Sequence, residues 1–514
     1  MHLAEHARRD PDSLALVVAD TGLRMTYGEL DDRSARVAGL LQHAGLREGD
    51  VVALLAENSV LSAEVYWAAM RRGLSFTPVD HSLGVEEIAY VINDSGARAL
   101  FISESMSELA GSLAALTPHV DVRFVRGSGI EHHEDYEGAL SSASVSVGDP
   151  WNGSELVYSA GTTGRPKGVR PLGVYGAAPD DRARPARHIA PCCGITANTV
   201  YLCAMPLYEP TSLQSFVAVQ MAGGTVVTLA EPSAEAVLGA IGRYRGSHTL
   251  CSVRVLSEMA RLPRATRARY DLSSLTLVIH TAAPCPAEVK RELLEWLGPI
   301  VCEFYGAAEG NGLTFITGME WLRKPGSVGR SVLGTVRVCD ADGHELPEGR
   351  VGLVYFDRPG RSFAYSNAPE LTRSVMHPWR ENWTTMGDIG YLEDGYLFLV
   401  DRKEFALTKD EGVVYPREVE DVLAEHPVIA DVAVVGMHDG QEQRRLRAVI
   451  RAADGTDVGP VLARELIEHV SDRIAHWKVP DKVDFVRELP RVATGKLIKR
   501  KVAAHYTVID SVAV

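Results

Sequence analysis

The pattern of apolar and polar residues in the N-terminal half of the chain predicts helices and strands in alternation. Residues 26–45 (TYGELDDRSARVAGLLQHAG) carry apolar side chains at helical spacing, and residues 50–58 form a short apolar run that suits a buried strand. A second helix is predicted at 63–73 and a second strand at 75–80. Because this alternation is typical of parallel sheets covered by helices, the sequence predicts an α/β fold.

The same pattern returns in the second half of the chain and then changes. Residues 215–230 predict a helix that leads into a strand, and residues 271–280 end in another apolar strand. From about residue 325 the sequence consists of short strands and turns, which is typical of a β-rich subdomain. A smaller α+β segment follows residues 394–404. It contains a predicted helix at 416–425, a strand at 431–436 and a helix at 459–477.

This change of pattern predicts a domain boundary near Asp401. A large N-terminal domain of stacked parallel-type sheets with helices is expected over residues 1–400, and its β-rich subdomain at about 325–400. A small α+β C-terminal domain is expected over residues 401–514. The length of 514 residues is sufficient for about two or three domains with a sizeable core.

Composition narrows the classes of function. The chain is 46% hydrophobic and 23% charged, which is ordinary for a globular cytoplasmic protein. Its net charge of −14 argues against a broad nucleic-acid-binding face. The N-terminal MHLAEHARRDPD lacks the apolar core of a signal peptide, and no run of roughly 18 apolar residues occurs, so no membrane span is expected. The seven cysteines form no CxxC pair and are expected to be buried, reduced thiols.

The segment YSAGTTGRPKGV, residues 158–169, offers the first candidate chemistry. Its glycines let the backbone approach a ligand, its N–H groups and hydroxyls can surround a phosphate chain, and Lys167 adds a positive charge. The order Gly-Thr-Thr-Gly-x-Pro-Lys-Gly differs from that of a Walker A loop. A loop rich in glycine and threonine is by itself also compatible with a surface turn. Other motifs are therefore needed to distinguish a phosphate-binding loop from such a turn.

Four more segments follow this loop along the chain. They are TAAPCP (281–286), FYGAAEG (304–310), TMGDIGYLEDGYLFLVDR (385–402) and LPRVATGKLIKR (489–500). Together with residues 158–169 they resemble five motifs of the adenylate-forming superfamily, which contains acyl- and aryl-CoA synthetases, nonribosomal peptide adenylation domains and luciferases. The motifs occur in family order over nearly the whole chain. The chain is therefore identified as a member of this superfamily, in its acyl-CoA synthetase branch.

The resemblance implies an enzyme that uses ATP and Mg²⁺ to activate a carboxylic acid. Lys496 matches the family's catalytic lysine, and Glu309 matches the glutamate that helps to hold Mg²⁺, with Thr162 as a second expected metal contact. Asp388 matches the carboxylate that accepts hydrogen bonds from the ribose hydroxyls. The nucleotide contacts implied by the motifs are Ser159, Gly161, Thr162, Thr163, Gly164, Lys167, Ala282, Ala283, Pro284, Tyr305, Gly306, Ala307, Ala308, Asp388, Leu399 and Arg402.

These residue types suit the expected chemistry. Adenylation joins two anions, a carboxylate and ATP, and expels pyrophosphate, so charge neutralisation and alignment are the main tasks. Lys496 would neutralise charge between the attacking carboxylate and the α-phosphate. Ala308 stands in place of a family threonine, and the loss of one hydroxyl contact costs about 1 kcal/mol without abolishing adenylation.

The resemblance also implies motion. Members of the superfamily rotate a small, mobile C-terminal domain between two half-reactions, adenylation and the capture of the acyl-adenylate by a thiol. Asp401 lies at the position of the hinge. A domain that is joined through one short segment is free to turn, and such a closure can gate the chemistry.

Two segments used in the thiol step depart from the family pattern. Where CoA ligases usually carry a Ser-Gly-Gly-type turn, this chain has Lys409, Asp410 and Glu411, and Gly412 comes only afterwards. A family loop of the form PDxxxGE reads MHDGQEQRRLR at 437–447. Because charged side chains would crowd a narrow thiol channel, we predict weak or absent transfer to CoA. A complete acyl-CoA ligase with a rebuilt turn is the alternative.

The acid pocket is expected around MPLYEPTSLQSF, residues 205–216. Glu209 replaces a family histidine, and its carboxylate suits a hydrogen bond from a substrate hydroxyl or a pair with an ammonium group. An outward-facing side chain or a structural ion pair is the alternative. The mixed residues suggest a bulky, largely apolar acid with at least one oxygen function. The chain also resembles the diterpenoid acid ligases of platensimycin and platencin biosynthesis, which implies a diterpenoid acid and a role in natural-product biosynthesis. The expected pocket residues are Tyr208, Glu209, Leu213, Phe216, Thr281 and Asn311.

Two further interpretations compete with an acid-activating ligase. A peptide-synthetase adenylation domain is disfavoured because no carrier-protein serine motif follows the last motif. A nucleotide-binding regulator on the same fold would predict loss of Lys496 or Glu309, and both are present. The expected partners are a small carboxylic acid and CoA, or a separate thioesterifying enzyme or carrier in place of CoA. A homodimer is also expected, because many relatives are dimers.

Overall fold

The computed structural model describes residues 3–127, 129–145, 153–159, 165–172, 184–409, 411–438, 444–492 and 495–512. The chain forms two units. The first comprises Met1–Pro325, Ser331–Thr335 and Arg358–Met376, and the second Gly326–Arg330, Val336–Asp357 and His377–Val514. Among the described residues, every helix is too short or too polar to cross a membrane. All seven cysteines are free, and five of them are buried.

The first unit contains a parallel sheet of six strands. They are β3 (Val51–Leu55), β4 (Ser75–Pro78), β5 (Ala97–Ile102), β6 (Val122–Val125), β7 (Glu134–Asp135) and β8 (Ser154–Glu155), in the order β7-β6-β5-β3-β4-β8. Alternate side chains of β3 enter two cores: Val52 and Leu54 belong to one cluster, and Val51, Ala53 and Leu55 to another. Because both faces of the sheet are covered, this strand is apolar throughout.

A second sheet of the first unit is also mostly parallel. Its strands are β1 (Leu14–Val18), β2 (Arg24–Thr26), β11 (Val200–Ala204), β12 (Thr225–Thr228), β13 (His248–Cys251), β14 (Leu277–His280), β15 (Val301–Gly306) and β16 (Leu313–Ile316). The strands in the order β1-β12-β11-β13-β14-β15 are parallel neighbours, whereas β2 and β16 pair antiparallel with β1 and β15. The carboxyl ends of β13, β14 and β15 therefore share one edge, which is where such sheets bind ligands.

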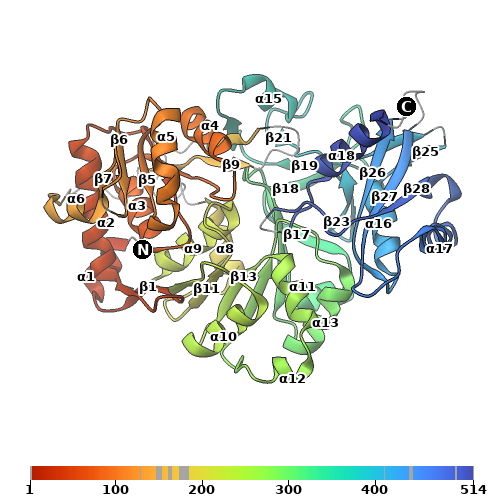
Figure 1. Ribbon diagram of the computed structural model, residues 1–514, viewed down its shortest axis with the longest axis horizontal. Helices are drawn as coiled ribbons and strands as arrows, with labels where there is room; N and C mark the ends of the chain where they lie inside the picture. Colours follow the sequence, from red (N-terminus) through yellow and green to blue (C-terminus); the bar gives the residue numbers. More distant parts are fainter. Residues whose placement is uncertain are drawn as a thin grey trace. The chain divides into compact units, whose positions relative to one another are not determined.

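Helices cover both sheets of the first unit, and one further helix, α15 (Pro369–Ser374), packs on β20 (Phe363–Tyr365) of a small third sheet. The other helices of this unit are α1 (Leu3–Arg9), α2 (Tyr27–His43), α3 (Val60–Arg71), α4 (Val85–Ser95), the 3-10 helix η1 (Glu104–Leu109), α5 (Ala110–Leu116), α6 (Tyr136–Ser142), α8 (Arg184–Cys193), α9 (Pro210–Ala222), α10 (Ala234–Tyr244), α11 (Val253–Arg261), α12 (Arg264–Arg267), α13 (Ala287–Leu297) and α14 (Gly318–Arg323). Val37 of α2, Val65 of α3 and Phe216 of α9 share one core with Val52 and Val226, so these helices join the two sheets. Figure 1 shows α10, α11 and α13 beside the second sheet.

A small antiparallel sheet completes the first unit. It consists of β9 (Val157–Ser159), β10 (Lys167–Pro171) and β20 (Phe363–Tyr365), with β10 in the middle. Lys167 pairs with Ser159, and Val169 pairs with Tyr365. The two stems of the predicted phosphate loop are therefore hydrogen-bonded to each other and to a strand that lies far along the chain.

The second unit contains most of the short strands predicted from about residue 325. These strands are β17 (Ser327–Leu333), β18 (Thr335–Cys339), β19 (Gly352–Asp357), β21 (Trp383–Thr384), β22 (Asp388–Glu393) and β23 (Tyr396–Arg402). Residues 331–335, at the end of β17 and the start of β18, belong to the first unit. Strand β22 lies between β19 and β23 in antiparallel pairing, β23 pairs with β17, and β21 pairs with β19. The hairpin of β22 and β23 places Asp388 directly opposite Arg402.

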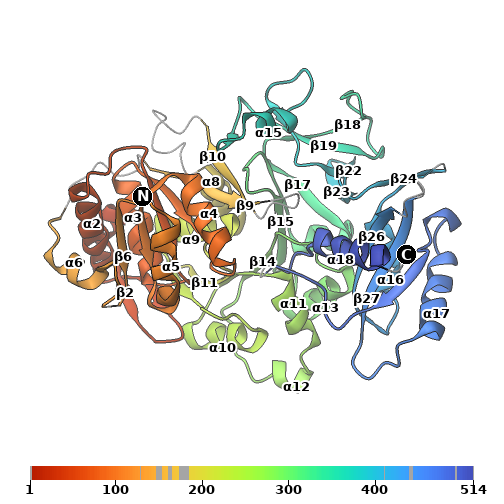
Figure 2. The ribbon, with the colours of Figure 1, turned by 45° about the horizontal axis from the view of Figure 1, so that its top comes forward.

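The C-terminal part of the second unit has two small cores of its own. Its elements are β24 (Leu407–Lys409), β25 (Gly412–Val414), α16 (Pro416–Ala424), β26 (Ile429–His438), β27 (Arg444–Ala452), α17 (Pro460–Ser471), the 3-10 helix η2 (His476–Lys478), β28 (Lys482–Phe485) and α18 (Lys499–Val512). Val434 of β26 packs with Leu423 of α16 and Leu466 of α17, whereas its neighbour Val435 packs with Val502 of α18. Helices therefore cover both faces of the β26-β27-β28 sheet, as Figure 2 shows.

The predicted α/β fold class is confirmed, and most predicted elements are observed within a few residues. The helix predicted at 459–477 is too long, because α17 ends at Ser471. Apolar spacing continues through Ile474 and Trp477, which misled the prediction. The chain nevertheless has to turn back toward β28, and the residue before Pro480 is disfavoured in a helix. The domain boundary at Asp401 stays a prediction.

Candidate active site

Glu309, Tyr365 and Lys167 come together in the first unit. Glu309 follows β15, and the hydroxyl of Tyr365 on β20 donates a hydrogen bond of 2.6 Å to its Oε1 atom. The Lys167 ammonium on β10 lies 5.8 Å from the centre of the Tyr365 ring. A carboxylate and a cation therefore contact the same aromatic side chain. This arrangement suits a polyphosphate together with its divalent cation.

The predicted phosphate loop starts and ends on paired strands. Ser159 and Lys167 are direct partners of β9 and β10, so the base of the loop is closed by backbone hydrogen bonds. The loop residues themselves lie outside the described residues, and their roles stay predictions. They are Gly161, Thr162, Thr163 and Gly164.

Asp94 of α4 holds this small sheet from outside. Its Oδ2 atom accepts a hydrogen bond of 2.7 Å from the Tyr158 hydroxyl, next to Ser159. The Asn367 amide, just beyond β20, donates to the carbonyl oxygen of Asp94 at 3.0 Å. Burial and the Asp94 carboxylate raise the pKa of Tyr158. Motif comparison missed Asp94 and Tyr365, because neither lies in a motif and only the fold brings them to one.

We expect Asp94→Ala to weaken ATP binding without removing it. The loss of a hydrogen bond to a charged group should lower the free energy of unfolding by about 2 kcal/mol. The loosened sheet should raise the KM for ATP by about threefold to tenfold, since phosphate contacts depend on alignment. Steady-state kinetics with varied ATP and urea unfolding measure the two effects. Asp121→Ala, which removes a half-exposed ion pair with Arg98, is the control and should change neither. An unchanged KM in the Asp94 variant would contradict the assignment.

The predicted adenine-flanking residues lie at the carboxyl ends of β14 and β15. Thr281 directly follows β14 and is buried, whereas Tyr305 and Gly306 end β15. Ala282 has a φ of 69°, in the left-handed region that costs an alanine roughly 1 kcal/mol. Such a conformation persists only where the surrounding structure enforces it. The remaining predicted nucleotide contacts of these two segments are partly or fully exposed. They are Ala283, Pro284, Ala307 and Ala308.

The backbone after Glu309 is held by a buried arginine. Arg358 is 7% exposed, and its Nη1 atom donates a hydrogen bond of 2.6 Å to the carbonyl oxygen of Gly310. Asn311, predicted for the acid pocket, is 2% exposed. The segment that carries Glu309 is therefore fixed on both sides, by Arg358 and by Tyr365.

The other predicted acid-pocket residues cluster at the start of α9. Tyr208 is buried, and its ring packs edge-on against His81 at 5.3 Å between centroids. Glu209 occupies the N-cap position of α9, but its side chain caps no helix N–H. Leu213 and Phe216 are packed in the main core, so the structure gives them a clear packing role. Their contact with the acid stays a prediction.

The second unit brings together Asp388, Arg402 and Asp401. The Arg402 Nε atom donates a hydrogen bond of 3.0 Å to Asp388 across the β22-β23 hairpin, and Leu399 lies on the same strand β23. Asp401 accepts 2.9 Å and 2.7 Å hydrogen bonds from the backbone N–H groups of Arg417 and Arg402. The carboxylate at the predicted hinge therefore satisfies an N–H in the first turn of α16.

Lys496 lies in a tight turn before α18. Its carbonyl oxygen accepts a hydrogen bond of 3.0 Å from the N–H of Val492, and Gly495 adopts a φ of 90°. Arg491 donates to the carbonyl oxygen of Gly495 at 2.6 Å and forms a 2.5 Å ion pair with Asp431 of β26. The backbone of the predicted catalytic lysine is thus anchored to the sheet, while its side chain is partly exposed.

The predicted thiol-step loop forms a β-hairpin. Lys409 and Gly412 are direct partners of β24 and β25, Glu411 is exposed, and Asp410 lies outside the described residues. The Lys409 ammonium donates a hydrogen bond of 2.8 Å to the carbonyl oxygen of Trp477. Gly412 adopts a φ of 149°, and a Cβ there would lie 3.2 Å from the Trp477 ring. The lysine therefore stabilises the hairpin through its bond to Trp477, and the glycine permits the close approach of the Trp477 indole.

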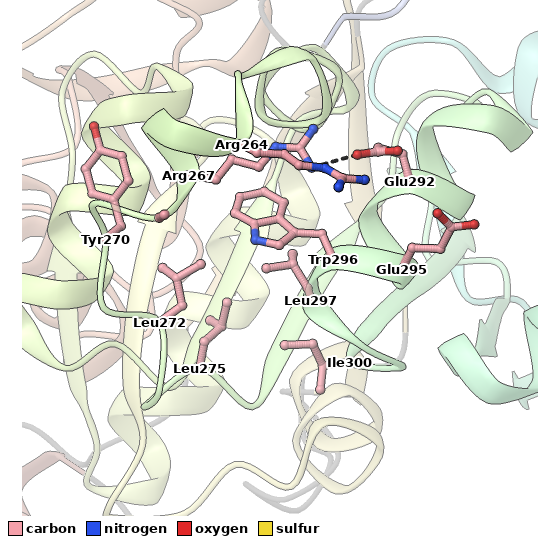
Figure 3. Close-up of a pocket in the computed structure, with 11 residues that line it drawn as sticks. Arg264, Arg267, Tyr270, Leu272, Leu275, Glu292, Glu295, Trp296, Leu297 and Ile300 are labelled. Atoms are coloured by element: carbon pink, nitrogen blue, oxygen red, sulfur yellow. Dashed lines mark hydrogen bonds and ion pairs between the residues drawn. The ribbon is translucent and has the colours of Figure 1, made fainter.

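Figure 3 shows a pocket of the first unit that lies apart from these residues. Its walls are side chains of α12 and α13 and of the segments leading into β14 and β15, such as Leu275 and Ile300. Because those segments enter the strands at their amino ends, the pocket opens at the edge opposite Thr281 and Tyr305. Of the described residues predicted for the site, none lines it.

Comparison with known proteins places the chain in a family. The family model for AMP-binding enzymes matches residues 3–365, and the model for the C-terminal domain of these enzymes matches residues 418–496. Feruloyl-CoA synthase from an Amycolatopsis species is 30% identical over 520 aligned positions, covering 97% of either chain. The fatty acid–[acyl-carrier-protein] ligase ScoC of Streptomyces coeruleorubidus is 28% identical over 503 positions, covering 96% of this chain and 94% of the relative.

Solved structures agree in fold over the full length. ATP-bound MatB from Rhodopseudomonas palustris superimposes with a TM-score of 0.85 at 26% identity, covering 99% of this chain and 100% of the other. The amide bond synthetase McbA from Marinactinospora thermotolerans gives a TM-score of 0.83 at 27% identity, covering 98% and 99%. The chain therefore belongs to the family of AMP-binding enzymes and is an acyl-adenylating ligase of the acyl-CoA synthetase branch.

Proposed function

We propose that this enzyme converts a carboxylic acid and ATP into an acyl-adenylate and pyrophosphate. An oxygen of the substrate carboxylate bonds to the α-phosphorus of ATP, and the bond from that phosphorus to the oxygen bridging to the β-phosphorus breaks. The convergence of Lys167 and Glu309 on Tyr365 carries the proposal, because it provides a cation for phosphate oxygens beside a carboxylate for their metal ion.

The carboxylate of Glu309 fits a magnesium ion. Mg²⁺ prefers oxygen ligands and is usually bound through one or two carboxylates together with substrate phosphates. Tyr365 donates to Oε1 only, and Oε2 accepts no hydrogen bond from the described residues. Thr162, the second expected contact, lies outside them. Bound Mg²⁺ would supply neutralisation of phosphate charge.

Three further residues carry the remaining proposed roles. Asp388 is mostly buried beside Arg402, and its carboxylate is proposed to accept the ribose hydroxyls. Lys496 is proposed to lie between the substrate carboxylate and the α-phosphate, where its charge offsets the repulsion of two anions. Asp401 is proposed as the hinge about which residues after it turn. The anchoring of the Lys496 backbone through Arg491 supports a defined lysine position.

The acid is proposed to be bulky and largely apolar, with an oxygen function, and a diterpenoid acid is the proposed class. Tyr208 and the neighbouring Glu209 support this, because they place an aromatic ring and a carboxylate at the start of α9 beside an otherwise apolar core. Burial and the charge of Asp80 raise the pKa of Tyr208, so its hydroxyl is available as a neutral donor or acceptor.

Transfer to CoA is proposed to be weak or absent. The charged hairpin of β24 and β25 supports this, since Glu411 is exposed where a glycine-rich turn would leave space for a thiol chain. The alternative is a complete acyl-CoA ligase, and the named activity of feruloyl-CoA synthase favours it. Other relatives are named for other reactions, a fatty acid–[acyl-carrier-protein] ligase in ScoC and an amide bond synthetase in McbA, so a separate acceptor enzyme or carrier is also compatible.

The first experiment incubates the protein with ATP, Mg²⁺ and acids that range from short fatty acids to polycyclic terpenoid acids. Mass spectrometry follows acyl-AMP and acyl-CoA in the presence and absence of CoA. We expect acyl-AMP from a bulky apolar acid and expect it to persist when CoA is added. Prompt formation of acyl-CoA would establish the alternative, and formation of neither product with any acid would count against acid activation.

Glycine at positions 410 and 411 is expected to raise CoA transfer. The double variant Asp410→Gly/Glu411→Gly removes two charged side chains from the turn and should increase the rate of acyl-CoA formation by about tenfold, while acyl-AMP formation stays unchanged. Lys409→Met is the matched control and should give no such gain in acyl-CoA formation. The Lys409 ammonium donates a hydrogen bond to the carbonyl oxygen of Trp477, so it is held by that contact. If the glycine variant gains nothing, two explanations remain: the altered loop at 437–447, or a rebuilt channel in which the turn does not obstruct the thiol.

A further inference from the structure

A buried ion pair lies beneath the proposed nucleotide-binding edge. The Lys290 ammonium donates a hydrogen bond of 2.5 Å to Oε2 of Glu303, and the two side chains are 1% and 11% exposed. The same ammonium lies 5.1 Å from the centre of the Trp321 ring of α14. A buried lysine needs a counter-charge and good hydrogen-bond geometry, because an unpaired buried charge is strongly destabilising. No motif of the sequence contains this lysine.

His280 completes the cluster. It is 0% exposed, pairs in register with Glu303 on the neighbouring strand, and its Nε2 atom lies 3.5 Å from Oε2 of Glu303. Neither ring nitrogen has a hydrogen-bond partner among the described residues. Burial lowers the pKa of His280 to about 4, so the imidazole is neutral at physiological pH. The cluster therefore consists of the Lys290–Glu303 ion pair and the neutral ring of His280, all three with little or no exposure to solvent.

The cluster brackets the segment proposed to contact adenine. His280 ends β14, residues 281–286 form the turn, and Lys290 lies in the first part of α13. Glu303 precedes Tyr305 by two residues on β15. The ion pair ties α13 to β15 and so closes the turn against the strand that carries Tyr305. Within the turn, Ala282 keeps a φ of 69° that requires support from its surroundings.

We propose that Lys290, Glu303 and His280 are positioning residues that set the shape of the 281–286 turn and thereby the affinity for the adenine end of ATP. This inference rests on the proposed function. The ion pair acts at a distance from the nucleotide: it fixes how far the start of α13 stands from β15. The 281–286 turn links that start to β14, the strand that pairs with β15. Replacing the pair changes the gap and therefore the alignment of the turn with Tyr305.

The test removes both charges at once, because a single substitution would leave an unpaired buried charge. Lys290→Met/Glu303→Gln keeps the approximate volume of both side chains. Calorimetric titration with ATP alone is expected to show binding that is weaker by roughly tenfold, since small displacements of contact groups have effects of this size. In kinetics with the acid, the KM for ATP should rise by a similar factor while the KM for the acid stays unchanged. Thermal unfolding should remain cooperative.

A second ion pair on the same helix is the control. Glu292 of α13 pairs with Arg267 at 2.7 Å, on the wall of the pocket in Figure 3 and away from the turn. In Glu292→Gln, Arg267 retains hydrogen bonds to the carbonyl oxygens of Ala260 and Leu262. This variant should bind ATP as the unmodified protein does. Equal weakening in both variants would overturn the proposal, because it would show general loosening of α13.

The outcomes separate this inference from the proposed function. Unmodified protein that binds no ATP would overturn both. Unmodified protein that binds ATP, together with a double variant of unchanged affinity, would overturn the positioning role alone. If the double variant does not fold, Lys290→Arg decides: the guanidinium keeps the charge but is larger, so ATP affinity should fall about threefold with an unchanged circular dichroism spectrum. Unchanged affinity in that variant would likewise overturn the role.

Discussion

Lys496→Ala should reduce acyl-AMP formation by at least about 100-fold, the size of effect that follows removal of one preorganised charge from a transition state. The substitution leaves the turn intact, because the bonds of Gly495 and Lys496 to Arg491 and Val492 involve backbone oxygens. ATP binding should therefore remain close to normal. Pyrophosphate release in the presence of acid measures the chemical step, and calorimetric titration with ATP measures binding.

A neighbouring lysine provides the control for this result. Lys501 is exposed at the start of α18, and Lys501→Ala should leave both pyrophosphate release and ATP affinity unchanged. Lys496→Arg should recover part of the activity, since it restores the charge without the compact ammonium group. Robust pyrophosphate release from Lys496→Ala would refute the assigned role, and a parallel loss of ATP binding would indicate a binding role in place of a catalytic one.

Glu309→Gln should lower kcat/KM for ATP by about 100-fold at fixed Mg²⁺, because the carboxylate charge that would help to hold the ion is removed. The amide oxygen of glutamine can still accept the hydrogen bond of Tyr365, so the local structure should persist. Raising the Mg²⁺ concentration should recover part of the activity. The measurement is initial rate against Mg²⁺ at several concentrations of ATP.

Tyr365→Phe is the matched control for Glu309→Gln. It removes the 2.6 Å hydrogen bond to Glu309 but keeps the ring beside Lys167 and the carboxylate charge. We expect a loss of less than about tenfold, because Glu309 is only partly buried and water can replace the lost donor, which leaves a net cost of about 0.5–1.5 kcal/mol. The phenylalanine ring preserves the packing. If Tyr365→Phe lost as much activity as Glu309→Gln, the hydroxyl would matter more than the metal-binding charge.

The two departures from the family pattern at the thiol step differ in structural meaning. Lys409 is bonded to Trp477 and Gly412 accommodates the indole, so these residues build the hairpin. Glu411 is exposed and makes no such contribution. The proposed obstacle to CoA therefore rests on the turn residues, which is why the experiment changes positions 410 and 411 and leaves Lys409 to the control.

The sequence by itself determined the fold class, most of the elements and the family. Apolar residues at helical spacing indicate the helix at 26–45, and a short continuous apolar run indicates the strand at 50–58, because both patterns are local properties of the chain. The resemblance of the motifs to those of the superfamily singled out Lys496, Glu309 and Asp388, and their roles stay predictions. The helix predicted at 459–477 was too long, since a turn back to a neighbouring strand has no signal in spacing alone.

Only the tertiary structure decided which side chains support the predicted ones. Tyr365 contacts Glu309, Asp94 contacts Tyr158 beside the predicted phosphate loop, and Lys290 of α13 contacts Glu303 of β15. Each of these contacts joins segments that are distant in sequence, so no local period or motif records it. Their existence depends on how strands pair and which helix covers which face. Hydrogen bonds and buried charges are satisfied through space, and their partners become known only when the fold brings them together.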